Sequence, residues 1–168
     1  MWKFASFFTH EILPRLASIG LQEFSSIEGH EQAIRRYRYG EVASKSGALI
    51  RIAPRWWPRH GSEWEAYQES YLRHLPKDFC RTYYAFPRCS PGFMSVLYAH
   101  SGPATRYRTL YRAVKTIDSI ARIKNAQAIV CQIMNERASE RLLKRWGYVR
   151  HAIKLGGHHY IKRLSIGT

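Results

Sequence analysis

A short loop with an anion-binding composition occupies residues 101–106, between an apolar segment and a long amphipathic one. A tight loop that leads directly into a helix presents backbone N–H groups and the positive end of the helix dipole to an anion. An arginine in such a loop can add a bidentate contact to phosphate oxygens. The segment therefore predicts a phosphate site formed by Ser101, Gly102, Ala104, Thr105 and Arg106. A plain helix-capping turn is the alternative.

A second cationic segment lies nearer the N-terminus, where arginines alternate with tyrosines. The residues are Arg35, Arg36, Tyr37, Arg38 and Tyr39. This alternation is typical of an extended segment with aromatic rings on one face and guanidinium groups on the other. Because rings stack on bases and arginines hold phosphates, the pattern suits a nucleic-acid surface. Tyrosines packed beneath a solvated row of arginines are the structural alternative.

The histidine and cysteine positions predict no metal centre. His158 and His159 are adjacent, so on a strand they would point to opposite faces, and no third ligand has a suitable spacing. The three cysteines, Cys80, Cys89 and Cys131, contain no CxxC pair. We interpret them as free thiols of a reduced, cytoplasmic chain, with a Cys80–Cys89 bridge across a hairpin as the alternative.

Length and charge limit the classes of protein to consider. A chain of 168 residues most simply forms one domain, residues 1–168, with room for a sizeable core. Lys and Arg outnumber Asp and Glu by 27 to 12, which gives a formal charge of +15. Such a charge attracts nucleic acid, an anionic membrane surface or a phosphorylated cofactor.

The N-terminal segment, residues 1–24, is predicted to be amphipathic and helical, with a bend near Pro14. It is interrupted too early by polar residues to be a signal peptide. The chain also lacks a span of about 20 apolar residues, so no integral membrane segment is expected.

The remaining elements follow from apolar periodicity and from the positions of glycine and proline. Residues 25–40 are predicted to be extended. Further strands are predicted at 47–53, 79–86, 93–100, 128–133, 148–155 and 159–164, and helices at 62–75, 105–125 and about 135–146. Gly147 ends the last helix, and Gly156-Gly157 supplies a hairpin turn between the last two strands.

The second half of the chain resembles a known family. From about residue 93, the order strand, loop, long helix, strand, helix and hairpin is similar to the C-terminal half of the GNAT superfamily of acetyl-CoA-dependent acyltransferases. The most specific match is SERLLKRWGY at residues 139–148, which resembles the family pattern S-x-R-[VL]-L-x-[KR]-x-G-F. The resemblance implies an α/β domain with a central mixed, mostly antiparallel sheet and helices on both faces. It also implies acetyl-CoA or another acyl-CoA as co-substrate, held by the 101–106 loop, Asn135 and Ser139.

Acyl transfer from a thioester to an amine needs a base for the amine and donors for the developing oxyanion. The predicted hairpin at 79–100 contains no carboxylate. His100, at the end of its second strand, and Tyr98, two residues earlier on the same face, are therefore the candidate catalytic residues. Histidine suits a base that works near neutral pH.

Two departures from the family pattern define the alternative hypothesis. Gly102 is the only glycine of the loop, and Pro103 removes one backbone donor. Leu143 occupies the position where many members place a tyrosine as acid. The leading hypothesis is thus an acyl-CoA-dependent N-acyltransferase or a diverged member with weak or lost catalysis. The alternative is a non-catalytic basic protein that binds nucleic acid or another polyanion on the same fold. The amine acceptor is undefined, an acidic acceptor would match the charge, and the oligomeric state is open.

Overall fold

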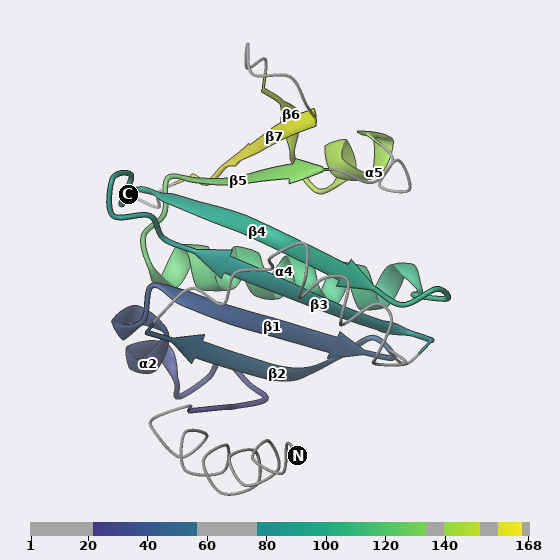
Figure 1. Ribbon diagram of the computed structural model, residues 1–168, viewed down its shortest axis with the longest axis horizontal. Coiled ribbons are helices and arrows are strands. Elements are labelled where there is room, and N and C mark those ends of the chain that lie inside the picture. The colour runs from purple at the N-terminus through teal and green to yellow at the C-terminus, as the bar shows by residue number, and fades with distance from the viewer. Residues whose placement is uncertain (1–21, 57–76, 134–139, 152–157, 166–168) are drawn as a thin grey trace, which may run out of the picture.

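Seven strands form one mixed sheet in the computed structural model, which describes residues 22–56, 77–133, 140–151 and 158–165 (Figure 1). The strand order is β2-β1-β3-β4-β5-β7-β6. The strands are β1 (Tyr39–Lys45), β2 (Ala48–Arg55), β3 (Phe79–Ala85), β4 (Phe93–Ser101), β5 (Ala128–Ile133), β6 (Val149–Arg150) and β7 (His158–Arg163). Neighbouring strands are antiparallel except for β4 and β5, which are parallel. The predicted mixed, mostly antiparallel sheet of an α/β domain is confirmed.

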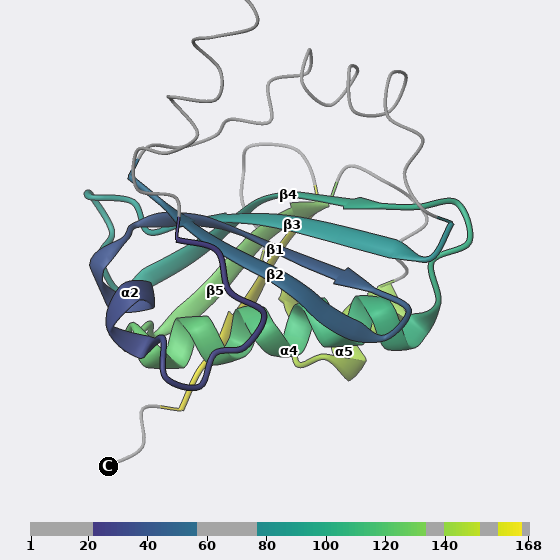
Figure 2. The ribbon, with the colours of Figure 1, turned by 90° about the horizontal axis from the view of Figure 1, so that it is seen from below.

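Three helices belong to the described residues: α2 (Glu31–Arg36), α4 (Tyr107–Ile123) and α5 (Glu140–Arg145). Figure 2 shows all three on one side of the sheet. Helix α4 packs across β1, β2, β3 and β5 because its buried residues recur at helical spacing. These include Ala113, Ile117, Ile120 and Ala121. The helices predicted at 62–75 and in most of 1–24 lie outside the described residues, so helices on the second face stay a prediction.

The core lies between the sheet and α4. Its most deeply buried apolar side chains are Ile34, Val42, Ile52, Tyr84, Met94, Ile120 and Ile129. Burying side chains of this size contributes about 1.5 to 3 kcal/mol each. Tyr84 lies directly over the backbone of Gly40, where an added Cβ atom would overlap the tyrosine ring. A glycine at this position therefore lets β1 lie beneath a large side chain of β3.

The prediction of an extended segment over residues 25–40 is wrong in part, because Glu31–Arg36 forms α2. Glu31 in its first turn and Arg35 and Arg36 in its last turn both complement the helix dipole. Strand β1, which the sequence did not reveal, begins at Tyr39. It turns into β2 at Ser46 and Gly47, which have φ angles of 52° and 84°, as two-residue hairpin turns require.

The element order of the second half is confirmed as β4, α4, β5, α5, β6 and β7. After α5 the chain passes through Gly147, whose φ of 86° is accessible to glycine at low cost. Tyr148 then donates its N–H to the carbonyl oxygen of Leu143 at 3.0 Å and closes the helix end. The predicted Gly156-Gly157 turn lies outside the described residues.

Candidate functional site

The parallel strands β4 and β5 pair over only part of their length. Their register runs from Phe93 opposite Ala128 to Val96 opposite Cys131. Strand β4 continues past that point to Ser101, whereas β5 ends at Ile133. In Figure 1 the two strands diverge beyond this paired part. The sheet is therefore split between β4 and β5 on the side where β4 leads into the 101–106 loop.

A β-bulge sets the direction of the candidate catalytic residues. Tyr84 lies opposite Val96 while Tyr83 lies opposite Tyr98, so Leu97 is an extra residue in β4. Residues paired across antiparallel strands share a face, and Tyr84 and Val96 belong to the core beneath α4. Tyr98 and the following alternate residue, His100, consequently lie on the face of the sheet away from α4.

Tyr98 and His100, which the sequence placed on one face of their strand, are in contact. The Tyr98 hydroxyl lies 3.2 Å from His100 Nδ1, and the two rings meet edge to face with centroids 6.0 Å apart. If Nδ1 carries the proton, it donates to the tyrosine oxygen and the Nε2 lone pair becomes the basic site. Both side chains are half-buried. The pair can therefore hold an imidazole in one orientation beside the split.

Backbone N–H groups of the 101–106 loop already donate hydrogen bonds to carbonyl oxygens of the protein. Gly102 donates its N–H to the carbonyl of Phe79 at 2.9 Å, and Ala104 donates to that of Lys77 at 3.0 Å. The N–H of Thr105 donates to the carbonyl of Gly102 at 3.2 Å. These bonds tie the loop to the start of β3. Pyrophosphate binding by Ser101, Gly102, Ala104, Thr105 and Arg106 stays a prediction, and it would require some of these donors to change partner.

A carboxylate already stands at the N-terminus of α4. Asp78 Oδ1 accepts the backbone N–H of Arg106 at 3.0 Å, while the Arg106 side chain stays largely exposed. A hydrogen bond from the Thr109 side chain, then that from the Arg106 backbone, holds the pKa of Asp78 below its ordinary value. Asp78 thus occupies part of the position that a phosphate would take. The Arg106 guanidinium, whose Nε lies 4.0 Å from Asp78 Oδ2, is 68% exposed and can be reached by a ligand.

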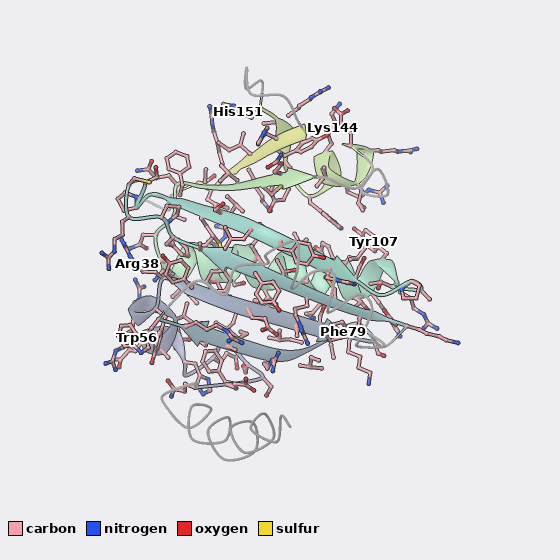
Figure 3. The ribbon with its side chains drawn as sticks, viewed as in Figure 1. Arg38, Trp56, Phe79, Tyr107, Lys144 and His151 are labelled. Atoms are coloured by element: carbon pink, nitrogen blue, oxygen red, sulfur yellow. The ribbon has the colours of Figure 1, made fainter. Side chains whose placement is uncertain are left out.

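Aromatic side chains join α4 to α5 beside the split. Trp146 Nε1 donates to the Tyr107 hydroxyl at 3.3 Å, and the two ring centroids are 6.2 Å apart. Tyr107 also stacks on Tyr111 at 5.8 Å. Both tyrosines are more than 40% exposed, so the cluster forms an accessible aromatic wall on the helix side. Figure 3 shows Tyr107 in the region between β4 and α5.

A buried charge cluster near the candidate pair was not predicted. The Glu41 side chain is fully buried and forms ion pairs with Arg51, Arg55 and Arg81. Glu41 lies opposite Tyr83, which in turn lies opposite Tyr98. Because three guanidinium groups share its two oxygens, Glu41 serves as a structural counter-ion. A single glutamate within YGEVASK gives no sequence signal for such a cluster.

Some predicted site residues cannot be placed. Asn135 and Ser139 lie outside the described residues, so their contacts to a cofactor stay predictions. Leu143 is buried in the core, consistent with its lack of a polar role. Cys80, Cys89 and Cys131 are free thiols, as the sequence analysis favoured.

Comparisons with known proteins give a distant structural likeness. No family model and no curated protein matches the chain. Among solved structures, the chain is similar to a nourseothricin acetyltransferase, with 12% sequence identity and a TM-score of 0.42. The likeness covers 84% of this chain and 97% of that chain. So distant a likeness assigns no function, which has to follow from the geometry of the chain itself.

Two classes of site are absent from the described part of the chain. No group of three or more His, Cys, Asp or Glu side chains is arranged to hold a metal ion there. Within the same residues, no helix combines the length and the apolar character needed to span a bilayer.

Proposed function

We propose that the protein is an acyl-CoA-dependent N-acyltransferase of the GNAT type. The observation that carries this proposal is the split between β4 and β5, which pair only as far as Val96 and Cys131 while β4 runs on to Ser101. Beyond the paired part, the backbone N–H and C=O groups of one strand no longer bond to the other strand. An extended ligand such as a pantetheine arm can form hydrogen bonds with these groups. The split opens where β4 leads into a loop and then into the N-terminus of α4.

The 101–106 loop and the N-terminus of α4 bind the co-substrate. Arg106 contacts the pyrophosphate through its exposed side chain, and Ser101, Gly102, Ala104 and Thr105 form the backbone that surrounds it. Asn135 and Ser139 complete the site from the segment after β5. The chain's charge of +15 favours an anionic co-substrate and would also favour an acidic acceptor.

The acyl transfer uses the Tyr98–His100 pair. The acceptor amine attacks the thioester carbonyl, and His100 Nε2 takes the proton that the amine nitrogen loses. The C–S bond then breaks, an amide forms, and the departing thiolate takes that proton back from the His100 imidazolium to leave as free CoA. The Tyr98 hydroxyl oxygen, 3.2 Å from His100 Nδ1, accepts a hydrogen bond from the Nδ1–H group and so stabilises the imidazolium that forms.

The test measures acetyl-CoA binding and acetyl transfer separately. Acetyl-CoA should raise the melting temperature of the protein more than heparin does at matched charge, because a specific ligand stabilises the folded state. Transfer to a panel of amines, followed by chromatographic detection of free CoA, should fall about 100-fold or more in His100→Gln. The control is His151→Gln, which changes an exposed histidine just after β6. Absence of acetyl-CoA binding, or equal activity in both variants, would contradict the proposal.

A further inference from the structure

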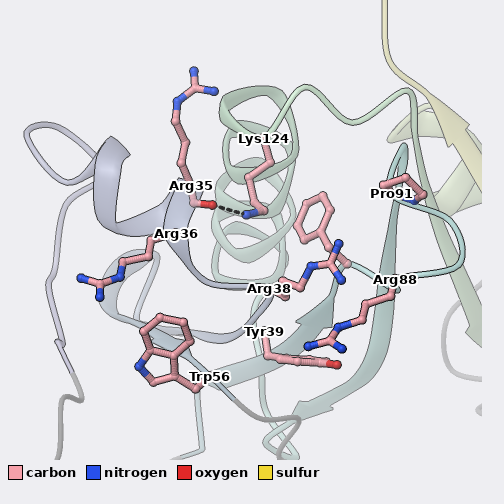
Figure 4. Close-up of a pocket in the computed structure, with 9 residues that line it drawn as sticks. Arg35, Arg36, Arg38, Tyr39, Trp56, Arg88, Pro91 and Lys124 are labelled. Atoms are coloured by element: carbon pink, nitrogen blue, oxygen red, sulfur yellow. Dashed lines mark hydrogen bonds between the residues drawn. The ribbon is translucent and has the colours of Figure 1, made fainter.

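A cationic cavity lies at the opposite end of the sheet from the split. Its volume is about 610 Å³, and Figure 4 shows its walls. The cavity is formed by the end of α2, the start of β1, the end of β2, the segment after β3 and the residue after α4. The lining residues are Arg35, Arg36, Arg38, Tyr39, Trp56, Phe86, Arg88, Pro91 and Lys124.

The lining carries five cations and no carboxylate. Within the described part of the chain, none of these arginines nor Lys124 forms an ion pair with an acidic side chain. Arg38 and Arg88 both line the cavity near Tyr39 (Figure 4), and an anion bound there would offset the repulsion between their like charges. The cavity is therefore built for a negatively charged ligand.

The ammonium group of Lys124 is held in one position at the wall of the cavity. Its ammonium donates to the carbonyl oxygens of Ile34, Arg35 and Tyr37 at 3.2, 2.8 and 2.8 Å. These bonds use all three of its protons, so Lys124 acts on a ligand through its charge rather than by donating to it. Burial, with a smaller effect of Arg38 and Arg35, lowers its pKa to about 8. A bound anion would relieve this electrostatic cost.

Trp56 supplies an aromatic surface beside the cations. The ring is 52% exposed, although the Arg36 guanidinium lies 5.1 Å from its centroid and Tyr37 meets it edge to face at 4.6 Å. These contacts hold the indole in place at the rim. An oriented, exposed ring next to arginines can stack a base while the arginines bind the neighbouring phosphates.

The cavity is separate from the proposed acyl-CoA site. Lys124 directly follows α4, whereas Tyr107 begins it, and a helix of 17 residues is about 25 Å long. Figure 3 places Arg38 and Trp56 at one end of the sheet and Tyr107 and Phe79 toward the other. One ligand of cofactor size would therefore need to be extended over the whole molecule to occupy both places.

We propose that this cavity binds single-stranded nucleic acid, with a backbone phosphate between Arg38 and Arg88 and a base against Trp56. Arg36 at the rim binds a neighbouring phosphate. A nucleic-acid strand fits better than a free nucleotide for two reasons. The cationic side chains extend from the floor of the cavity to its exposed rim, and their number is larger than one phosphate group needs. The overall charge of +15 assists a long polyanion in the same way. The proposal is independent of the acyltransferase function.

The experiment measures binding of a fluorescein-labelled dT12 strand by fluorescence anisotropy over a series of salt concentrations. The double variant Arg38→Gln/Arg88→Gln should bind at least about 10-fold more weakly. Its plot of log affinity against log salt should also be shallower by about 0.7, the change expected when a single strand loses one phosphate contact. Trp56→Leu should weaken binding about 5-fold or more, with an unchanged salt slope.

The matched control is Arg141→Gln/Arg145→Gln, which removes the same charge from exposed positions on α5. It should change affinity less than about threefold. Equal losses in the two double variants would mean that general charge is responsible and would overturn the proposal, as would an absence of dT12 binding. Unlabelled ADP that competes as well as an unlabelled strand would also overturn it, in favour of a single-nucleotide site. Arg88→Gln alone, at an exposed position, repeats the test if the double variant fails to fold.

Discussion

The ammonium of Lys124 lies 2.8 Å from the carbonyl oxygen of Tyr37 and ties the end of α4 to the chain that leaves α2. Among the described residues this ammonium forms no ion pair with an acidic side chain, and it donates to three carbonyl oxygens that hold it in place. This lysine links the helix layer to the start of β1. It thereby brings the arginines of α2, and Arg38 just before β1, to one side of the cationic cavity.

Replacing Lys124 with methionine should lower the free energy of unfolding by about 1 to 3 kcal/mol, because the carbonyl oxygens lose charged donors. Urea denaturation at neutral pH measures the change. Lys115→Met is the control, since Lys115 is exposed on the same helix and contacts only the face of Tyr111 among the interactions described. A loss no larger than that of the control would show that the three bonds contribute nothing net.

Affinity for the nucleic-acid strand should depend on pH through Lys124. Its pKa is lowered to about 8, so the free protein loses this charge between pH 7 and pH 9, while the arginines of the cavity keep theirs. Binding of dT12 should weaken by roughly two- to fivefold over this interval, as expected for the loss of one partly exposed charge. Lys124→Met should give a flatter profile. If the dT12 affinities of the wild type and of Lys124→Met depended equally on pH, Lys124 would not be the group responsible.

The lowered pKa of Lys124 also predicts how its contribution to the free energy of unfolding changes with pH. Because the pKa is lower in the folded state than the ordinary 10.5, the unfolded chain binds more protons between about pH 8 and pH 10.5. The wild-type protein should therefore gain stability relative to Lys124→Met as the pH rises through this range. Urea denaturation of both proteins at several pH values measures the difference.

Asp78 and a ligand phosphate would compete for the N-terminus of α4. Asp78→Asn removes a negative charge while retaining an oxygen that can accept the Arg106 N–H. We expect the variant to bind acetyl-CoA several-fold more tightly, because the repulsion between the carboxylate and the pyrophosphate is removed. Isothermal titration calorimetry at low salt measures this. Weaker binding would indicate that the carboxylate positions the loop for its ligand.

The pH dependence of the free energy of unfolding tests separately whether the charge of Asp78 stabilises the fold. Since the pKa of this carboxyl is lowered in the folded protein, its contribution is present above its ordinary value of 3.8 and is lost as the pH falls below it. The stability difference between wild type and Asp78→Asn should therefore shrink between pH 5 and pH 3, the interval chosen for the test. An unchanged difference would show that the charge of Asp78 does not stabilise the fold.

The sequence predicted the elements whose burial follows a simple period. Helix α4 has a clear apolar stripe, and the strands β3, β4 and β5 are apolar runs bounded by glycine, proline or polar turns. Strand β1 was missed because Gly40 and Glu41 interrupt its apolar pattern. Both residues are explained only by partners from other strands: Tyr84 covers Gly40, and three arginines neutralise Glu41.

The two sites differ in how far the sequence could reveal them. His100 and Tyr98 are two residues apart in one strand, so their contact follows from strand periodicity. The cationic cavity instead joins Arg36, Trp56, Arg88 and Lys124 from distant segments. The arginine-tyrosine alternation at residues 35–39 predicted a cationic surface with aromatic rings. Only strand pairing and the position of α4 could bring the other residues to it.

The hydroxyl of Tyr84 provides a test of packing near the centre of the sheet. It is buried without a hydrogen-bond partner in the part of the chain that the structure describes, and burial raises its pKa. Tyr84→Phe keeps the ring and removes a hydroxyl whose desolvation is uncompensated. We expect a free energy of unfolding equal to that of the wild type or higher by up to about 1 kcal/mol. Tyr84→Ala, which also removes the ring, should cost about 3 to 5 kcal/mol. If Tyr84→Phe is destabilised by more than about 1 kcal/mol in urea denaturation, the hydroxyl must have a partner in the folded protein.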